Sequence, residues 1–160
     1  MKPLLRLTLA AALLVPAAAS AHEFKAGALE IVHPWARATP AVAKTAAGYL
    51  TVINSGTEAD RLVGIECGCA AAAMLHETKV ENDVASMRHV EAVEIPPGGT
   101  VKLAPGGIHV MFVGLTAPFK EEDRLDATLL FEKAGRVPVE FYVQGIASTA
   151  PSHEHGKEGQ

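Results

Sequence analysis

The stretch GGIHVMFVGL, residues 106–115, combines the pattern of a β-strand with two side chains that can bind a metal ion. Successive side chains of an extended strand point to opposite faces, so Ile108, Val110 and Phe112 are predicted to share one apolar face. His109 and Met111 then share the other face. An imidazole and a thioether are both neutral near pH 7, and each can donate a lone pair to a soft metal ion. The stretch therefore predicts a strand with one core face and one metal-binding face.

Two further segments repeat this combination of histidine and methionine. One residue separates Met74 from His76, and one residue separates Met87 from His89, so each pair is predicted to share one face of a strand. For a single pair, a methionine that fills the core and a histidine at the surface would be the more ordinary interpretation. Three such pairs on neighbouring strands favour a metal site. Thioether and imidazole ligands select Cu(I), whereas Zn²⁺ prefers thiolate, imidazole or carboxylate.

The first 21 residues are typical of a signal peptide. Lys2 and Arg6 come before an apolar run, and the small residues Ala19 and Ala21 match a signal-peptidase site, so cleavage is expected before His22. The apolar run is shorter than the roughly 20 residues that a membrane-spanning helix needs. We therefore expect a periplasmic protein that is not inserted in the membrane after cleavage. The role of His22, which as a new N-terminus can chelate Cu(II) through its amine and imidazole, is left open.

Charge and motifs exclude several classes of function. Removing residues 1–21 takes away two of the 14 basic residues and none of the 18 acidic residues, which leaves a net charge of −6 with neutral histidines. A surface that binds nucleic acid needs a basic excess or a basic patch, and this chain has neither. It also lacks the nucleophile elbow, P-loop and dinucleotide fingerprint of common enzymes. Neither a nucleic-acid partner nor an enzymatic activity is expected, and a copper enzyme built on His22 is kept as a minor alternative.

Short segments of strand-like composition follow one another along the mature chain, separated by turn clusters rich in Gly, Pro, Asn and Asp. The predicted strands cover residues 29–38, 47–56, 60–66, 73–80, 84–90, 100–105, 108–115, 124–135 and 136–145. About nine strands at this spacing indicate an all-β, antiparallel Greek-key β-sandwich of immunoglobulin-like or cupredoxin-like type. The prediction is one domain over residues 22–147, followed by a disordered, histidine-containing tail over residues 148–160.

Cys67 and Cys69 flank a single glycine at the end of a predicted strand. In an oxidising compartment they can form a disulfide, although a bridge across one residue is tight. Thiolate ligation of a metal and inert free thiols are the other two interpretations, and the sequence leaves all three open. The alanine-rich segment that follows, residues 69–75, could form a short helical turn, since alanine favours helix.

The spacing of four residues resembles a known family. His76 is followed by ten residues and Met87, and then by twenty-one residues, His109, one residue and Met111. This pattern is the signature of the periplasmic copper chaperones called PCuAC. The flanking segments WARATP, AGYLTVINSG, DRLVG and PGGIHVMF are similar to the family as well, so the resemblance covers most of residues 29–145.

The resemblance implies a cupredoxin-like β-sandwich that binds one Cu(I) near its surface through His76, Met87, His109 and Met111. It also implies a metallochaperone that delivers copper for the copper centre of cytochrome c oxidase. Its acceptor would be a periplasmic copper-accepting protein, such as the oxidase copper subunit or a thiol copper chaperone. Some members bind a second copper on a C-terminal extension, which here would be a Cu(II) held by tail histidines. The tail histidines are His153 and His155.

Two alternatives belong to other functional classes. An electron-transfer cupredoxin needs a cysteine thiolate with two histidines and a weak axial methionine, usually close together late in the chain. Both cysteines here precede the first candidate ligand, His76, by at least seven residues, which argues against that class. A copper storage or resistance protein would use the same ligands without delivering the ion to an acceptor. His89 lies outside the signature, and its role is left open.

Overall fold

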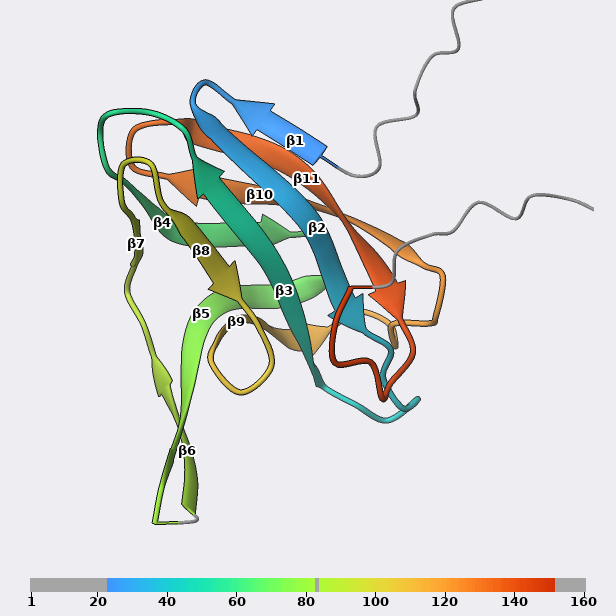
Figure 1. Cartoon of the computed structure of the whole chain (residues 1–160). Helices are drawn as coiled ribbons and strands as arrows, with labels where there is room; N and C mark the ends of the chain where they lie inside the picture. Colours follow the sequence, from blue (N-terminus) through green and yellow to red (C-terminus); the bar gives the residue numbers. More distant parts are fainter. Residues whose placement is uncertain (1–22, 83, 152–160) are drawn as a thin grey trace, which may run out of the picture.

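The computed structural model describes residues 23–82 and 84–151. The expected signal peptide, the expected N-terminus at His22 and the tail histidines His153 and His155 lie outside these residues. The described part of the chain is built from β-strands joined by turns (Figure 1), which confirms the all-β prediction. Within this part, no helix is long and apolar enough to span a bilayer.

The described strands follow one another in chain order with short connections. Their bounds are β1 Glu23–Ala26, β2 Leu29–Arg37, β3 Thr45–Asn54, β4 Asp60–Cys67, β5 Ala70–Glu81, β6 Val84–His89, β7 Val93–Ile95, β8 Thr100–Leu103, β9 Ile108–Leu115, β10 Arg124–Phe131 and β11 Gly135–Gln144. All nine predicted segments contain a strand. β1 and β7 were not predicted, because strands of three or four residues are too short to show a clear alternation of apolar and polar side chains. β8 is as short as β1, but turn clusters on both sides marked it.

The strands pair in the order β6-β5-β9-β3-β2-β11-β10-β4-β7, with β1 added to β2 and β8 added to β3. Every pair is antiparallel except β2 and β11, which are parallel through Trp35 and Tyr142 and the two residue pairs that follow. The prediction of a wholly antiparallel sandwich was therefore wrong at this pair. Parallel neighbours need a long crossover connection, and here nearly the whole domain connects the two strands.

The paired strands fold over a shared apolar core. Phe112 of β9 lies 5.7 Å from Phe141 of β11 between ring centroids, although these strands are not neighbours in the pairing order. Phe119 packs against Phe112 at 5.6 Å. A Cβ atom added at Gly48 of β3 would lie 2.8 Å from Phe112 and 3.1 Å from Phe141. Glycine at position 48 therefore lets the two phenylalanines pack over β3.

The alanine-rich segment is part of a strand and not a helical turn. Ala70 pairs with Leu115 and Ala72 pairs with Val113, so these residues extend β5 along β9. The prediction of a helical turn was wrong because backbone pairing with a neighbouring strand outweighs the weak helix preference of alanine.

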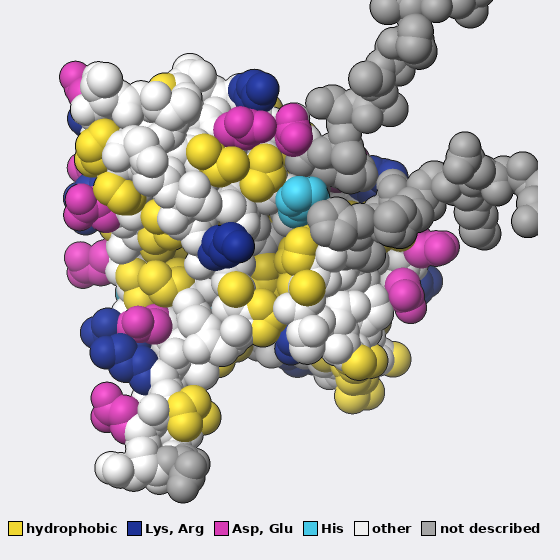
Figure 2. Space-filling model, in the orientation of Figure 1, with side chains coloured by type: hydrophobic (Ala, Val, Ile, Leu, Met, Phe, Trp, Pro, Cys, Tyr) yellow, Lys and Arg dark blue, Asp and Glu magenta, His cyan; other side chains and the backbone are white. Residues whose placement is uncertain are grey.

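β5 and β6 form a long hairpin that projects from the body of the sandwich (Figure 1). β6 is the last strand in the pairing order, and all six of its residues are exposed. Charged side chains of both signs gather on this hairpin together with hydrophobic ones (Figure 2). The hairpin thus places the exposed edge strand β6 two strands away from β9, with β5 between them.

The chain beyond β11 lies against the sandwich for several residues. Arg37 of β2 donates a hydrogen bond from Nε to the carbonyl oxygen of Ser148, at 2.8 Å. Residues 149–151 lie beside Trp35 and Leu103. The predicted domain boundary at residue 147 stays a prediction, and the tail from residue 152 onward is outside the described residues.

Candidate metal centre

Six side chains of types that can bind a soft metal ion lie on one face of three neighbouring strands. His76 of β5 is directly opposite His109 of β9 on one side and His89 of β6 on the other. Met74 is opposite Met111, and Met87 is opposite Thr78, next to His76 along the diagonal. Directly opposite side chains have Cβ atoms about 5 Å apart, and diagonal neighbours remain within reach of long side chains. The structure thus brings together all four residues of the signature.

The opposite face of the same strands forms core, as the alternation predicts. Val110 and Phe112 are fully buried in β9, and Leu75 is buried in β5. His109 lies on the other face of β9 but is only 5% exposed. This second face is therefore also covered by other residues at the position of His109. The prediction of one core face and one imidazole and thioether face is confirmed for β9.

Exposure rises along the row of imidazoles from β9 to the sheet edge. His109 is buried, His76 is partly buried and His89 is exposed. The thioethers follow the same trend, since Met111 is partly buried whereas Met87 is 50% exposed. The candidate centre therefore opens to solvent on the side of β6.

The distances between the rings suit a shared metal ion. The ring centroids of His76 and His109 are 6.2 Å apart, and those of His76 and His89 are 5.9 Å apart. An imidazole nitrogen lies about 2 Å from the metal that it binds, so two rings on one ion have centroids roughly 5 to 6 Å apart. Either pair can hold one ion after small side-chain rotations.

His109 is held in one tautomer by the backbone. Its Nδ1 atom lies 3.1 Å from the carbonyl oxygen of Gly107. A carbonyl oxygen only accepts hydrogen bonds, so Nδ1 of the neutral ring carries the proton and donates it. The lone pair is then on Nε2, as in metal-binding histidines whose other nitrogen donates to a backbone carbonyl. The loop before β9 thereby fixes the tautomer of His109 that has its lone pair on Nε2.

His76 has a buried nitrogen that lacks a hydrogen-bond partner. Among the described residues, its Nδ1 is the one buried side-chain nitrogen or oxygen without such a partner. Leaving a buried polar atom unpaired costs free energy, and such an atom points to a role. Burial, followed by the nearby imidazoles of His109 and His89, lowers the pKa of His76. The ring therefore stays neutral, and able to bind a metal, to lower pH than an ordinary histidine.

The side chains available to complete a coordination sphere are thioethers. In the described ranges, no three histidine, cysteine, aspartate or glutamate side chains are grouped so that they could hold one metal ion. A pair of imidazoles must therefore be supplemented by the methionines of the same face. Two imidazoles with thioethers suit Cu(I) better than Zn²⁺.

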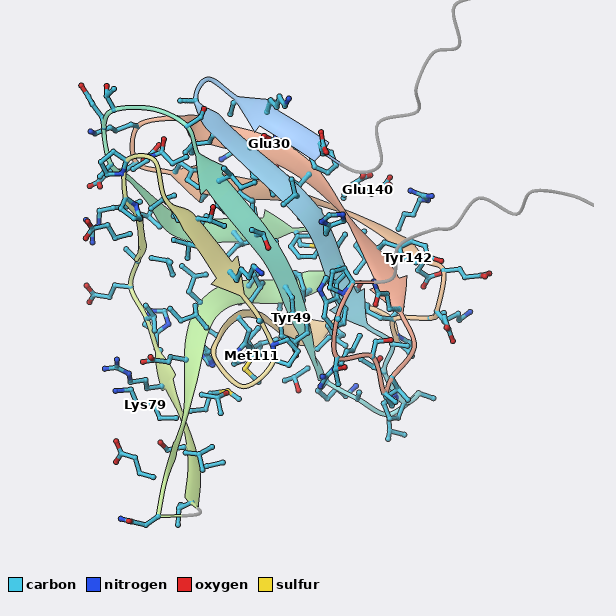
Figure 3. All side chains as sticks on the ribbon, viewed as in Figure 1. Glu30, Tyr49, Lys79, Met111, Glu140 and Tyr142 are labelled. Atoms are coloured by element: carbon cyan, nitrogen blue, oxygen red, sulfur yellow. A yellow bond between two sulfur atoms is a disulfide. The ribbon has the colours of Figure 1, made fainter. Side chains whose placement is uncertain are left out.

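Tyr49 borders the centre on the side of β3, a position that was not predicted from the sequence. Its ring centroid is 6.4 Å from that of His109 and 4.5 Å from that of Trp35. Tyr49 and Met111 come from neighbouring strands near the loop that joins β8 to β9 (Figure 3). The guanidinium carbon Cζ of Arg37 lies over the Tyr49 ring, 5.6 Å from its centroid. Alternation from the core-facing Gly48 would have placed Tyr49 on this face.

The two cysteines are not part of the centre. Cys67 and Cys69 form a disulfide in the turn between β4 and β5, and the described chain contains no free cysteine. The structure thus selects the disulfide and contradicts the interpretations as thiolate ligands or free thiols. His76 is the seventh residue after Cys69, which corresponds to about 23 Å along an extended strand.

A β-sandwich that presents imidazoles and thioethers on one sheet face defines a metal-binding β-domain. The family model described as "Putative lipoprotein LpqE-like" matches residues 29–143 of the chain. The "Putative lipoprotein Lxx21020" of Leifsonia xyli subsp. xyli (strain CTCB07) is 30% identical over 161 residues, covering 94% of this chain and 96% of that protein.

Two solved structures extend the comparison. The copper-bound PCuAC domain from PmoF2 has a TM-score of 0.68 and 31% identity, and the match covers 78% of this chain and 98% of that domain. The solution structure of apo-DR1885 from Deinococcus radiodurans has a TM-score of 0.60 and 27% identity, and the match covers 94% of this chain and 100% of that chain. The chain belongs to the LpqE-like family, which is the PCuAC family, and its fold is the cupredoxin-like β-fold.

Proposed function

We propose that this protein is a Cu(I)-binding metallochaperone whose ligands are His76, Met87, His109 and Met111. The observation that carries the proposal is the grouping of these four side chains on one face of β6, β5 and β9, with a buried, unpartnered Nδ1 on the central His76. Copper is the cargo of the protein and not a resident cofactor. Copper-bound PmoF2 and CuI-DR1885 support copper as the metal, since both are similar to this chain.

Delivery of the ion suits the chemistry of these ligands. All four are neutral near pH 7, so each can leave the metal in turn without leaving an unpaired buried charge. Met87 is half exposed at the edge of the sheet, where an acceptor can reach the ion. We propose a periplasmic acceptor such as the copper subunit of cytochrome c oxidase or a thiol copper chaperone, reached by ligand exchange. The description of relatives as lipoproteins supports an exported, envelope-associated protein.

Electron transfer and storage are the competing functions. A cupredoxin of the electron-transfer class needs a thiolate ligand, and the disulfide between Cys67 and Cys69 removes both candidates. A storage protein would bind copper at the same face but would not release it to an acceptor. Transfer of Cu(I) from the loaded protein to an apo acceptor domain, monitored by separating the two proteins and measuring copper, distinguishes a chaperone from a storage protein.

The ligand assignment is tested by competition titration with a chromogenic Cu(I) chelator. Met87→Ala and His109→Ala are each expected to lower Cu(I) affinity at least about tenfold, because each removes one ligand. Ser86→Ala is the matched control, since Ser86 is equally exposed in β6 but points to the opposite face. X-ray absorption of the loaded protein should show sulfur and nitrogen ligands together. Unchanged affinity in both ligand variants would exclude this site.

A further inference from the structure

His89 extends the row of imidazoles beyond the four proposed ligands. It lies directly opposite His76 in the β5–β6 hairpin, and the two ring centroids are 5.9 Å apart. This distance is as short as the 6.2 Å between His76 and His109. His76 therefore has one imidazole neighbour on each side, a buried one on β9 and an exposed one on β6.

We infer that the metal face contains two overlapping copper positions that share His76 and Met87, an inner one completed by His109 and Met111 and an outer one completed by His89. The inference rests on the proposed function and adds a route by which Cu(I) enters and leaves. His89 is then the residue through which the ion is exchanged with an acceptor. We call these sets the inner position and the outer position.

The two positions are alternatives and not one larger site. In the described chain, no three histidines are grouped closely enough to hold one ion, although each neighbouring pair is. His89 and His109 are on strands separated by β5, so they are about two strand spacings, roughly 10 Å, apart at the backbone. An ion bound to His76 can therefore bind either His109 or His89, but not both at once.

Exposure gives the two positions different roles. The inner position has a buried His109, fixed by the carbonyl of Gly107, and a partly buried Met111. The outer position has two exposed side chains on the edge strand β6. A prepared and buried ligand favours retention of the ion, whereas exposed ligands are accessible to an acceptor but lose more side-chain entropy on binding. Cu(I) should thus reside mainly in the inner position and leave through the outer one.

The exchange is balanced without a redox step. Copper remains Cu(I) throughout, and its bonds to His76 and Met87 are kept during the shift. The bonds from copper to His109 and Met111 break as a bond to His89 forms and a ligand of the acceptor binds. The ligands that this protein supplies are all neutral near pH 7, so no charge is moved and no oxidant or reductant is needed. The acceptor then replaces His89, Met87 and finally His76 from the solvent side, which completes the transfer.

The test compares rate with equilibrium in the full-length mature protein. The variants are His89→Ala, with Ser86→Ala as the control on the opposite face of β6. Stopped-flow transfer of Cu(I) to excess chelator should slow about tenfold in His89→Ala, because an exchange step that loses a ligand has a higher barrier. Competition titration should show that its Cu(I) affinity stays within about threefold of wild type, a small change beside the 10- to 100-fold that metal-site mutations typically cost. Ser86→Ala should change neither quantity.

Met111→Ala is expected to have the opposite effect to His89→Ala, because it should change the Cu(I) affinity and not the release rate. It removes an inner ligand, so it should lower affinity about tenfold without slowing release. A wild-type release rate in folded His89→Ala would overturn the outer position, and so would an affinity loss in His89→Ala as large as that in His109→Ala. If His89→Ala does not fold, His89→Gln replaces it and is judged by the same two outcomes. Failure of the wild-type protein to bind Cu(I) would instead contradict the proposed function.

Discussion

His76 is the residue on which the candidate centre depends. It is opposite an imidazole on each neighbouring strand, and its Nδ1 is buried without a hydrogen-bond partner. A residue with these surroundings destabilises the apo protein slightly, since its polar atom is paired neither with protein nor with solvent. Binding of a metal would satisfy this atom.

The lowered pKa of His76 leads to a prediction about acid. Burial, and then the nearby His109 and His89, disfavour its protonated form, so in the apo protein it should titrate below the ordinary value of about 6.5. A pH titration of the histidine ring signals by NMR, assigned with His76→Gln, measures this. A His76 ring that titrates above 6.5 would contradict the burial and the charge neighbours described here.

The same shift has a consequence for stability. The folded state binds a proton at His76 less readily than the unfolded state does. This residue's contribution to stability is therefore fully present above about pH 6.5 and is lost as pH falls through the lowered pKa. Urea unfolding of the apo protein between pH 7.5 and 5 should show a smaller decrease in stability for His76→Gln than for wild type. Equal decreases would mean that another group titrates.

Cu(I) affinity should also decline in acid, because a histidine must be neutral to bind the ion. Between pH 7 and 5, protons compete with copper for the imidazole ligands, while the thioethers of Met87 and Met111 take up none. Chelator competition at pH 8, 7, 6 and 5 should show little change between pH 8 and 7. A steep drop in that interval, abolished by Cys67→Ser, would instead indicate a thiol site.

At the scale of elements, β3 and β5 hold the site between the core and solvent. β3 presents Gly48 to the phenylalanines of the core and Tyr49 to His109. Gly48→Ala should destabilise the fold by about 1–3 kcal/mol, because its Cβ would overlap Phe112 and Phe141. Thermal or urea unfolding measures this. Gly107→Ala is the control, since its added Cβ would meet its nearest neighbour at an ordinary 3.7 Å, and unchanged stability of Gly48→Ala would contradict the packing.

The turn between β4 and β5 carries the disulfide, and it should affect the fold but not the metal. Replacing Cys67 and Cys69 together by serine is expected to leave Cu(I) affinity unchanged, because the pair lies about 23 Å along β5 from His76. Unfolding should become easier, although a loop this short stabilises little by entropy. Competition titration of the double variant with wild type as the control measures the first effect. A large loss of Cu(I) affinity would mean that the cysteines take part in metal binding.

At the scale of the whole molecule, the ordered domain is expected to be sufficient for Cu(I). Truncation after Pro151 removes His153 and His155 but none of the proposed ligands, so Cu(I) affinity should stay within about twofold of the full chain, because the four ligands remain. Cu(II) uptake should fall, since imidazoles bind Cu(II) well and the removed segment has no thioether. Titration with each oxidation state separates the two effects. Loss of Cu(I) binding would place a tail histidine in the main site.

The sequence by itself determined the local part of this protein. Alternation with a period of two predicted which side chains of β9 face the core and which form the imidazole and thioether face. The turn clusters located nine of the strands. Both signals act within a few residues. The spacing of His76, Met87, His109 and Met111 predicted the family, and the comparisons confirm that membership. None of these inferences required knowledge of which strands are neighbours.

Only the tertiary structure decided how the strands are paired and what each ligand touches. Register places His89 directly opposite His76 and makes β2 and β11 parallel, since pairing depends on contacts between segments far apart in the chain. Packing buries His109 and Tyr49 on a face that alternation alone would leave in solvent, and it leaves Nδ1 of His76 unpaired. The pairing of β5 also turns an alanine-rich segment into strand, because long-range hydrogen bonds outweigh local propensity.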